Sequence, residues 1–198
     1  MRLRRLLRTE LPVGSAALAR FLIGKTVVRA VPGGRMLGRI VETEAYLPRD
    51  AASHAFNGMT RRNRVLFMQR GHAYVYFIYG NHFMLNVSGE EEGIGGGVLL
   101  RALEPLEGLD FMQKLRGDVS VRDLARGPGR LAQALKVDLR LQAVDLCAAG
   151  PLWLGAPLKP PGRIGRSVRI GISKDAHRRL RFYERGNAFV SGPAALRE

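Results

Sequence analysis

The stretch from Gly38 to Tyr46 places the strongest constraint on the fold. It follows a turn signal, VPGG at positions 31–34, and it reads GRIVETEAY, which alternates as a β-strand does. Because side chains two apart share a face of a strand, one face is expected to carry Ile40, Glu42, Glu44 and Tyr46. Burying a carboxylate is costly unless it is paired. This stretch alone therefore favours a solvated edge strand, and the segments that follow change that interpretation.

The balance of charge indicates a polyanionic partner. The 198 residues include 32 Lys+Arg against 17 Asp+Glu, which gives a formal net charge of +15 at pH 7. An excess of this size is typical of proteins that bind nucleic acid. Arginine, which forms forks with phosphates and stacks on bases, far outnumbers lysine. A GC-rich genome would explain arginine in place of lysine, but not the excess of basic over acidic residues.

The sequence argues against several kinds of site and location. Cys147 is the only cysteine, so the chain can form no internal disulfide, Cys-ligated zinc site or iron–sulfur cluster. No apolar run reaches membrane-spanning length, and the N-terminal segment lacks the apolar region of a signal peptide. We therefore expect a cytoplasmic, nucleoid-associated monomer that uses no metal or cofactor and contacts no membrane.

A helix, a strand and a long basic loop are expected in the first third of the chain. The helix is capped by Ser15 and stopped by Gly24, and the strand Lys25–Val31 is expected to pair with the Gly38–Tyr46 stretch. From position 47 to 71 the chain is polar, and a loop of this length usually binds something or is disordered. Its most basic run can be a solvated surface, but we interpret it as a DNA-backbone contact made by Arg61, Arg62, Asn63 and Arg64.

The next segment predicts a β-hairpin with a tyrosine near its tip. Residues 73–80 read AYVYFIYG, which is typical of a strand, and residues 83–88 form a second strand. Gly80 and Asn81 mark the turn, so Tyr79 is expected close to it. An aromatic stripe is more often packing than a ligand platform. A tyrosine at an exposed tip beside a basic loop can instead wedge between stacked bases.

A second apolar strand carries an isolated charge. Val98–Leu103 is a buried-looking strand in which Arg101 must either reach solvent or pair with a carboxylate. A helix is expected over Pro105–Arg116. Another helix is expected to start at Gly127-Pro128, where free N–H groups and Arg130 form a candidate phosphate site, although an ordinary helix start explains the same residues.

The C-terminal part predicts a strand and a terminal hairpin. The strand covers Arg163–Ser173, and the hairpin is formed by residues 181–183 and 189–190. The sequence contains no internal repeat and no domain boundary, so we expect one domain over residues 1–198.

Five segments in this order resemble one family. They are IVETEAY at 40–46, RNR at 62–64, YVYFIYG at 74–80, VLLRALEPLEG at 98–108 and RFY at 181–183. Together, over residues 18–192, they resemble the alkyladenine (3-methyladenine) DNA glycosylase family of the mammalian type. The resemblance implies a mixed α/β (α+β) single domain, in which a curved antiparallel β-sheet has flanking helices and a protruding β-hairpin. It also implies double-stranded DNA with damaged purines as the partner.

The resemblance further implies roles for individual residues. Glu44, not Glu42, matches the carboxylate that activates water, a choice that the strand pattern leaves open. Arg101 and the backbone carbonyl of Ile170 match groups that hold this water, and Tyr79 matches the intercalating wedge. The base pocket is matched by Tyr46, His54, Tyr76, Asn86 and Leu99. Within it, the Asn86 side chain is expected to collide with the 2-amino group of guanine. The match of His54 depends on small gaps, because the preceding segment is shorter than in mammalian members.

The implied reaction is hydrolysis of the N-glycosidic bond of a flipped purine, which leaves an abasic site. The candidate lesions are 3-methyladenine, 7-methylguanine, hypoxanthine and ethenoadenine. Because a carboxylate and not a lysine matches the activating position, no Schiff base is expected. The alternative is a catalytically silent nucleic-acid-binding module, which the charge alone would explain, and a third possibility is an RNA-directed relative. Glu44 on the same face as Tyr46 argues against a silent module, which gains nothing from a carboxylate facing phosphate.

Overall fold

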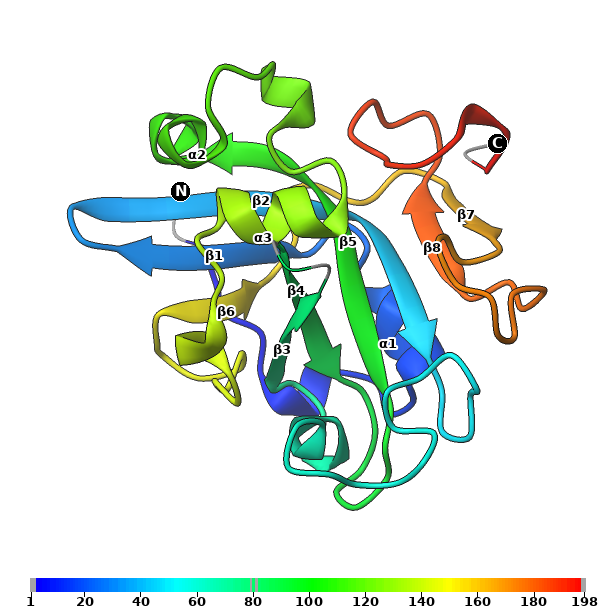
Figure 1. Ribbon diagram of the computed structural model, residues 1–198. Coiled ribbons are helices and arrows are strands. Elements are labelled where there is room, and N and C mark those ends of the chain that lie inside the picture. Colours follow the sequence, from blue (N-terminus) through cyan, green and yellow to red (C-terminus); the bar gives the residue numbers. More distant parts are fainter. Residues whose placement is uncertain (1–2, 79, 81, 197–198) are drawn as a thin grey trace.

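A curved antiparallel sheet forms the centre of the computed structural model, which describes residues 3–78, 80 and 82–196 (Figure 1). The strand order is β3-β4-β5-β2-β1-β6, and β8 adds to β2 and β7 to β8. The strands are β1 (Thr26–Val31), β2 (Gly34–Tyr46), β3 (Ala73–Ile78), β4 (His82–Ser88), β5 (Gly97–Glu107), β6 (Leu152–Gly155), β7 (Ile164–Ser167) and β8 (Arg181–Glu184). This arrangement confirms the predicted mixed α/β fold with a curved antiparallel sheet.

Strand β2 organises the sheet because it pairs with three others. One edge pairs with β5 along most of its length, and the other edge pairs first with β1 and then with β8. The register to β5 shifts near Val41. As a result Ile40 packs in the same core as Ala45, while Val41 packs in a separate cluster with Tyr183. The sequence predicted that Ile40 shares a face with Glu42 and Glu44. That prediction is wrong because the register shift, a β-bulge, interrupts the alternation between Ile40 and Glu42.

Strand β1 pairs with the first half of β2, whereas the sequence predicted pairing with residues 38–46. Thr26 to Val31 pair with Arg39 to Gly34, so the two strands form a tight hairpin closed at Gly33, whose φ is 81°. The prediction had assigned the later residues of β2 to this partner. Those residues pair instead with β5 and β8, which brings the carboxylates of β2 into the middle of the sheet.

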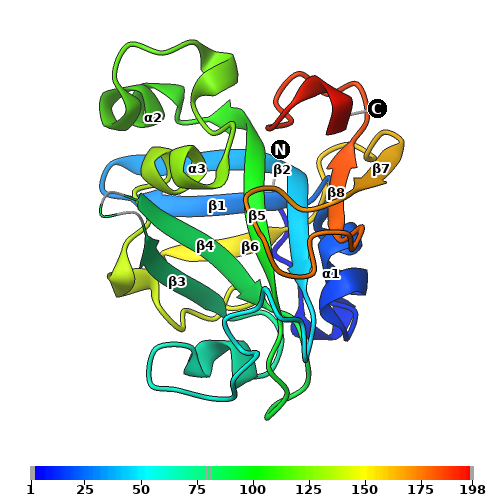
Figure 2. The same ribbon diagram turned by 45° about the vertical axis from the view of Figure 1, so that its right-hand side comes forward.

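In the described part of the chain, three short helices pack against the sheet (Figure 2). They are α1 (Ser15–Leu22), α2 (Leu109–Arg116) and α3 (Pro128–Ala134). Helix α1 lies against β2, β5 and β8, and α3 lies against β4 and β5. Gly14, not Ser15, is the residue before α1, and Ser15 instead donates its N–H and its hydroxyl to Glu90. The expected start of α3 at Pro128 is confirmed, whereas α2 begins later than Pro105 because that proline still pairs with Gly38 in β5.

The C-terminal segments depart most from the sequence-based expectation. Strand β7 ends at Ser167, and the following residues form a loop that contains Gly171 at a φ of 76°. Strand β8 pairs with β7 and β2, while residues 189–190 are not in a strand, so no terminal hairpin forms. The reason is tertiary, because β7 and β2 supply the backbone hydrogen-bond partners that a local hairpin would otherwise supply.

Candidate active site

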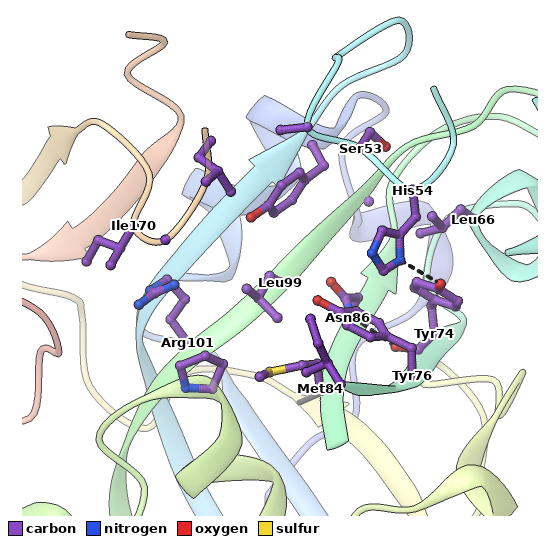
Figure 3. A pocket seen from close by; sticks show the side chains of 17 residues that line it. Ser53, His54, Leu66, Tyr74, Tyr76, Met84, Asn86, Leu99, Arg101 and Ile170 are labelled. Carbon is purple, nitrogen blue, oxygen red and sulfur yellow. Dashed lines mark hydrogen bonds between the residues drawn. The ribbon is translucent and has the colours of Figure 1, made fainter. Parts of the chain in front are cut away.

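A pocket of about 330 Å³ opens between the β3–β5 part of the sheet and the loops that follow β2 and β7 (Figure 3). Its lining comprises Tyr46, Ala52, Ser53, His54, Leu66, Tyr74, Tyr76, Ile78, Met84, Asn86, Gly97, Leu99, Arg101, Pro128, Ile170, Gly171 and Ile172. All five residues expected in the base pocket are among them, together with Arg101. The fold thus brings residues from distant segments to one cavity.

Aromatic rings form one side of the pocket. The His54 and Tyr76 rings lie 4.4 Å apart between centroids, and the Tyr74 ring lies 5.5 Å from Tyr76. Nδ1 of His54 is 2.9 Å from the Tyr74 hydroxyl. Burial, with a further contribution from Arg62, holds the pKa of His54 below its ordinary value, while burial raises the pKa of Tyr74 to about 12. At neutral pH this side of the pocket is therefore uncharged and suited to a flat aromatic ligand.

Glu44 lies on the other side of the pocket, directly beneath its lining. The side chain has no exposed surface, yet its three partners all line the cavity. Oε1 accepts a hydrogen bond of 2.7 Å from the Ile170 N–H and lies 3.3 Å from Nη1 of Arg101, and Oε2 accepts one of 3.0 Å from the Tyr46 hydroxyl. Burial raises the pKa of Glu44, although Arg101 and the Ile170 amide oppose this. A buried carboxyl beside a cavity, with a raised pKa, is a candidate proton acceptor.

Glu42 has a different environment, which assigns it to the framework. It accepts hydrogen bonds from Nε of Arg181 at 2.6 Å, Nε of Arg101 at 2.9 Å and the Ser191 N–H at 2.6 Å. Burial opposes its ionisation, but the charges of Arg101 and Arg181 hold the pKa of Glu42 below its ordinary value. Glu42 does not line the pocket. The geometry therefore separates two glutamates that the strand pattern could not.

Arg101 joins the two carboxylates. Its guanidinium contacts Glu42 through Nε and Glu44 through Nη1, and part of it faces the pocket. The sequence left two possibilities for Arg101, reaching solvent or pairing with a carboxylate, and the structure shows the pairing. The Ile170 contact to Glu44 comes from its amide, and the predicted contact of its carbonyl with water stays a prediction.

Asn86 and Met84 form the part of the pocket between these two sides (Figure 3). The amide of Asn86 donates to the Tyr74 carbonyl at 3.2 Å, which holds the side chain in one orientation. Met84 faces Tyr76 across the hairpin, and Leu99 faces Asn86 from β5. Sequence reasoning did not pick out Met84, although the hairpin register alone puts it on the face that carries Tyr76.

The predicted DNA-contacting residues lie on the surface with one exception. Arg61, Arg62 and Arg64 are exposed, and Arg62 reaches the end of β3 through the Phe77 carbonyl at 3.4 Å. Asn63 is 4% exposed, because its side chain binds the carbonyls of His54 and Gly58 and the Thr60 N–H. It thus shapes the loop that carries His54, and DNA contact by the three arginines around it stays a prediction.

Of the two remaining predicted residues, the structure describes Arg130 but not Tyr79. Arg130 is exposed at the start of α3 and lies 3.2 Å from Asp123. Tyr79, the predicted wedge, falls outside the described residues, as does Asn81 beside it. The strands on either side of them pair as a hairpin from Ala73–Val87 to Ile78–His82. The expected hairpin is confirmed, and the role of its tip stays a prediction.

Residues 3–78, 80 and 82–196 contain neither a cluster of metal-ligating side chains nor a membrane-spanning helix. No group of three or more His, Cys, Asp or Glu side chains in this part of the chain is arranged to hold a metal ion. None of the helices there is long and apolar enough to cross a membrane.

Comparison with known proteins points to one family. The sequence pattern of methylpurine-DNA glycosylases matches residues 11–188. A protein of Mesorhizobium japonicum named as a 3-methyladenine DNA glycosylase is 63% identical over 191 residues, which are 96% of this chain and 92% of that protein. One of the same name from Paraburkholderia phytofirmans is 51% identical over 96% of this chain and 90% of its own length. Another, from Methanoculleus marisnigri, is 49% identical over 78% of this chain and 82% of its own.

Proposed function

The chain belongs to the methylpurine-DNA glycosylase family, and from this premise we propose that Glu44 activates the water that releases a damaged purine from DNA. Membership identifies the protein as a DNA-repair enzyme, a monofunctional hydrolase that acts on N-glycosyl bonds, and DNA as its substrate. The alternative of a catalytically silent binding module is set aside on the same ground. The assignment of individual residues rests on the geometry of the pocket.

The observation that carries the assignment is the environment of Glu44. A fully buried acid is held by three groups, from Tyr46, Arg101 and Ile170, and each of these residues lines the same cavity. Its neighbour Glu42 does not line the cavity, and both of its oxygens are bound, by Arg101, Arg181 and the Ser191 amide. We infer that water reaches Oε1 of Glu44 beside Arg101 and Ile170, where the lining contacts the carboxylate.

Hydrolysis of the N-glycosidic bond then needs only a water molecule, Glu44 and Arg101. The bond between C1′ of the sugar and the base nitrogen breaks, and the base leaves with the electron pair. Water attacks C1′ and loses a proton to Glu44, whose negative charge also stabilises the developing sugar cation. Arg101 keeps the carboxylate oriented and is itself fixed by Glu42. The product is an abasic site.

The aromatic side of the pocket is suited to an extruded purine. Flipping a nucleotide costs roughly a few kcal/mol, least for a damaged or mispaired base, and stacking on an aromatic ring returns about 1–3 kcal/mol per base. His54 and Tyr76 line the cavity on this side and Tyr46 lines it on the opposite side, so we infer that the base stacks between them. Asn86, fixed by its bond to the Tyr74 carbonyl, would meet a 2-amino group and thereby reject guanine.

The surrounding surface supports a duplex substrate. Arg61, Arg62 and Arg64 are exposed next to Asn63, which binds the loop that carries His54, and we infer that they bind backbone phosphates. Arg130 on α3 is a further candidate. Tyr79 is proposed to fill the gap that the flipped nucleotide leaves. We also propose that the enzyme works as a monomer in the nucleoid.

The test is excision of hypoxanthine from a labelled duplex, read on a gel after alkaline cleavage of the abasic site. Glu44→Gln is expected to abolish excision while retaining affinity for the damaged duplex. A Glu44→Gln protein that excises at the wild-type rate contradicts the assignment. Borohydride trapping of a covalent protein–DNA adduct would contradict the water-based mechanism.

A further inference from the structure

A buried ion pair joins the two loops that border Glu44. Asp50 lies just after β2 and Arg169 just after β7, and both side chains are fully buried. Nη2 of Arg169 lies 3.0 Å from Oδ1 of Asp50, and Nη1 bonds Oδ2. Neither residue lines the pocket, yet their loop neighbours Ser53 and Ile170 do. The pair is thus a tie between two walls of the cavity.

The pair also touches the residues that hold Glu44. Nη1 of Arg169 donates to the Ala45 carbonyl at 3.0 Å, and the guanidinium lies 4.7 Å from the centroid of the Tyr46 ring. The next residue along the chain is Ile170, whose amide binds Oε1 of Glu44. On the other loop, Asp50 accepts the Ala52 N–H at 3.1 Å. One guanidinium therefore constrains both residues that follow Glu44 and the amide that binds it.

Stability alone does not explain this arrangement. A buried ion pair adds little net stability over well-packed apolar side chains, because desolvation offsets the attraction. In addition, Nε of Arg169 is buried and has no hydrogen-bond partner among the described residues. A group that is buried at such a cost needs another reason for its place, and its contacts with Tyr46 and Ala45 supply one.

We propose that Asp50 and Arg169 are positioning residues that fix the Tyr46 ring and the Ile170 amide against Glu44. The proposal rests on the proposed role of Glu44, because neither residue touches the cavity in which the reaction occurs. The Arg169 guanidinium lies over the face of the Tyr46 ring and so fixes its position. The same residue is bonded through its peptide to Ile170 and so fixes the Ile170 amide, while Asp50 holds the guanidinium in place. Loss of the tie releases the amide from Oε1 and weakens the stabilisation of the charged form of Glu44.

The pH dependence of excision can separate positioning from simple electrostatics. Glu44 is faced by Glu42 and Tyr46 from β2, Arg101 from β5 and the Ile170 amide, while Arg181 from β8 pairs with Glu42. Asp50→Asn removes a negative charge, which by itself would lower the pKa of Glu44. If the amide is released instead, the pKa of Glu44 rises, because that hydrogen bond favours the carboxylate. The two explanations predict shifts of opposite sign.

The experiment measures single-turnover excision of hypoxanthine from a duplex between acid and neutral pH. For Asp50→Asn we expect a rate about 10- to 100-fold lower at neutral pH, with the acidic limb moved up by about one pH unit. Binding of the damaged duplex should change little. Arg169→Lys keeps the charge but loses the fork, so it should show the same changes, smaller in size, and it serves if Asp50→Asn does not fold.

The matched control is Glu184→Gln, which breaks another buried ion pair, with Arg39, that lies outside the pocket. It should lose thermal stability but keep the wild-type rate and acidic limb. A wild-type profile for Asp50→Asn, or an acidic limb moved down, overturns the positioning role. Glu44→Gln is measured in parallel, and excision by that variant would refute the proposed function itself, whatever the result for Asp50→Asn.

Discussion

Replacing each of the two buried glutamates of β2 by glutamine should change stability in very different ways. Glu42 is bound by Arg181, Arg101 and the Ser191 amide, so it compensates two buried guanidinium groups. Removing one partner from a buried ion pair typically costs about 3–5 kcal/mol, because the remaining charge is left uncompensated. In a chain of this size, a loss of about 1 kcal/mol in the free energy of unfolding lowers the melting temperature by roughly 2–4 °C. Glu42→Gln should therefore lower the melting temperature by roughly 6–20 °C.

Glu44→Gln should leave stability nearly unchanged at neutral pH. Glutamine keeps an oxygen that can accept the Ile170 N–H, and Arg101 keeps its bond to Glu42. The substitution also removes a buried charge, whose desolvation is the largest influence on the pKa of Glu44. Losing the contact with Arg101 destabilises the folded state, whereas removing a buried charge stabilises it. We therefore expect the free energy of unfolding to change by no more than about 1 kcal/mol in either direction.

The pH dependence of stability should also have opposite signs at the two sites. The folded-state pKa of Glu42 is lowered, so its stabilisation is present above its unfolded-state pKa and is lost as the pH falls through the folded-state value. The folded-state pKa of Glu44 is raised, so stability at this site decreases as the pH rises from the unfolded-state to the folded-state value. Glu44→Gln should remove that decrease.

The assay is thermal unfolding of the wild type and both variants, measured by circular dichroism across a range of pH and paired with the excision assay. The expected pattern is a stable but inactive Glu44→Gln and a destabilised Glu42→Gln. If Glu44→Gln is destabilised as much as Glu42→Gln, Glu44 belongs to the framework and the reasoning is refuted. The same conclusion follows if Glu42→Gln is stable and inactive while Glu44→Gln is active.

Three further predictions concern the pH dependence of excision, the choice of base and the binding of DNA. Because burial raises the pKa of Glu44 above its ordinary value of 4.5, single-turnover excision should fall with decreasing pH along a limb centred above that value, and a limb at or below 4.5 would contradict it. Asn86→Ser should increase excision of guanine relative to hypoxanthine, because the amide no longer occupies the space of the 2-amino group, and unchanged guanine excision would count against this steric role. Arg62→Ala should reduce the slope of log affinity for the duplex against log salt concentration by about one unit, while the excision rate at saturating enzyme stays the same. The control is Arg20→Ala, which replaces an exposed arginine of α1. An equal effect of that control would show that the slope reports net charge alone.

Local sequence patterns were sufficient for the elements that depend on neighbours in the chain. The hairpin of β3 and β4 follows from two β-rich runs with a turn signal between them. The two-residue period of a strand determines that Tyr74 and Tyr76 share a face. The start of α3 follows in the same way from Pro128. The excess of arginine and the family resemblance also came from the sequence alone, and the comparisons confirm that resemblance.

The strand pattern left the two glutamates equivalent, the family resemblance favoured Glu44, and only the tertiary structure gave the physical reason. A period of two residues states that Glu42 and Glu44 share a face, but not which partners each will meet. Those partners come from far along the chain, with Arg101 59 residues from Glu42 and Ile170 126 residues from Glu44. The sequence thus determined the kind of chemistry, a carboxylate beside aromatic rings on a basic protein. Only long-range packing decided which carboxylate borders the pocket, because burial and ion pairing depend on contacts that strand periodicity does not encode.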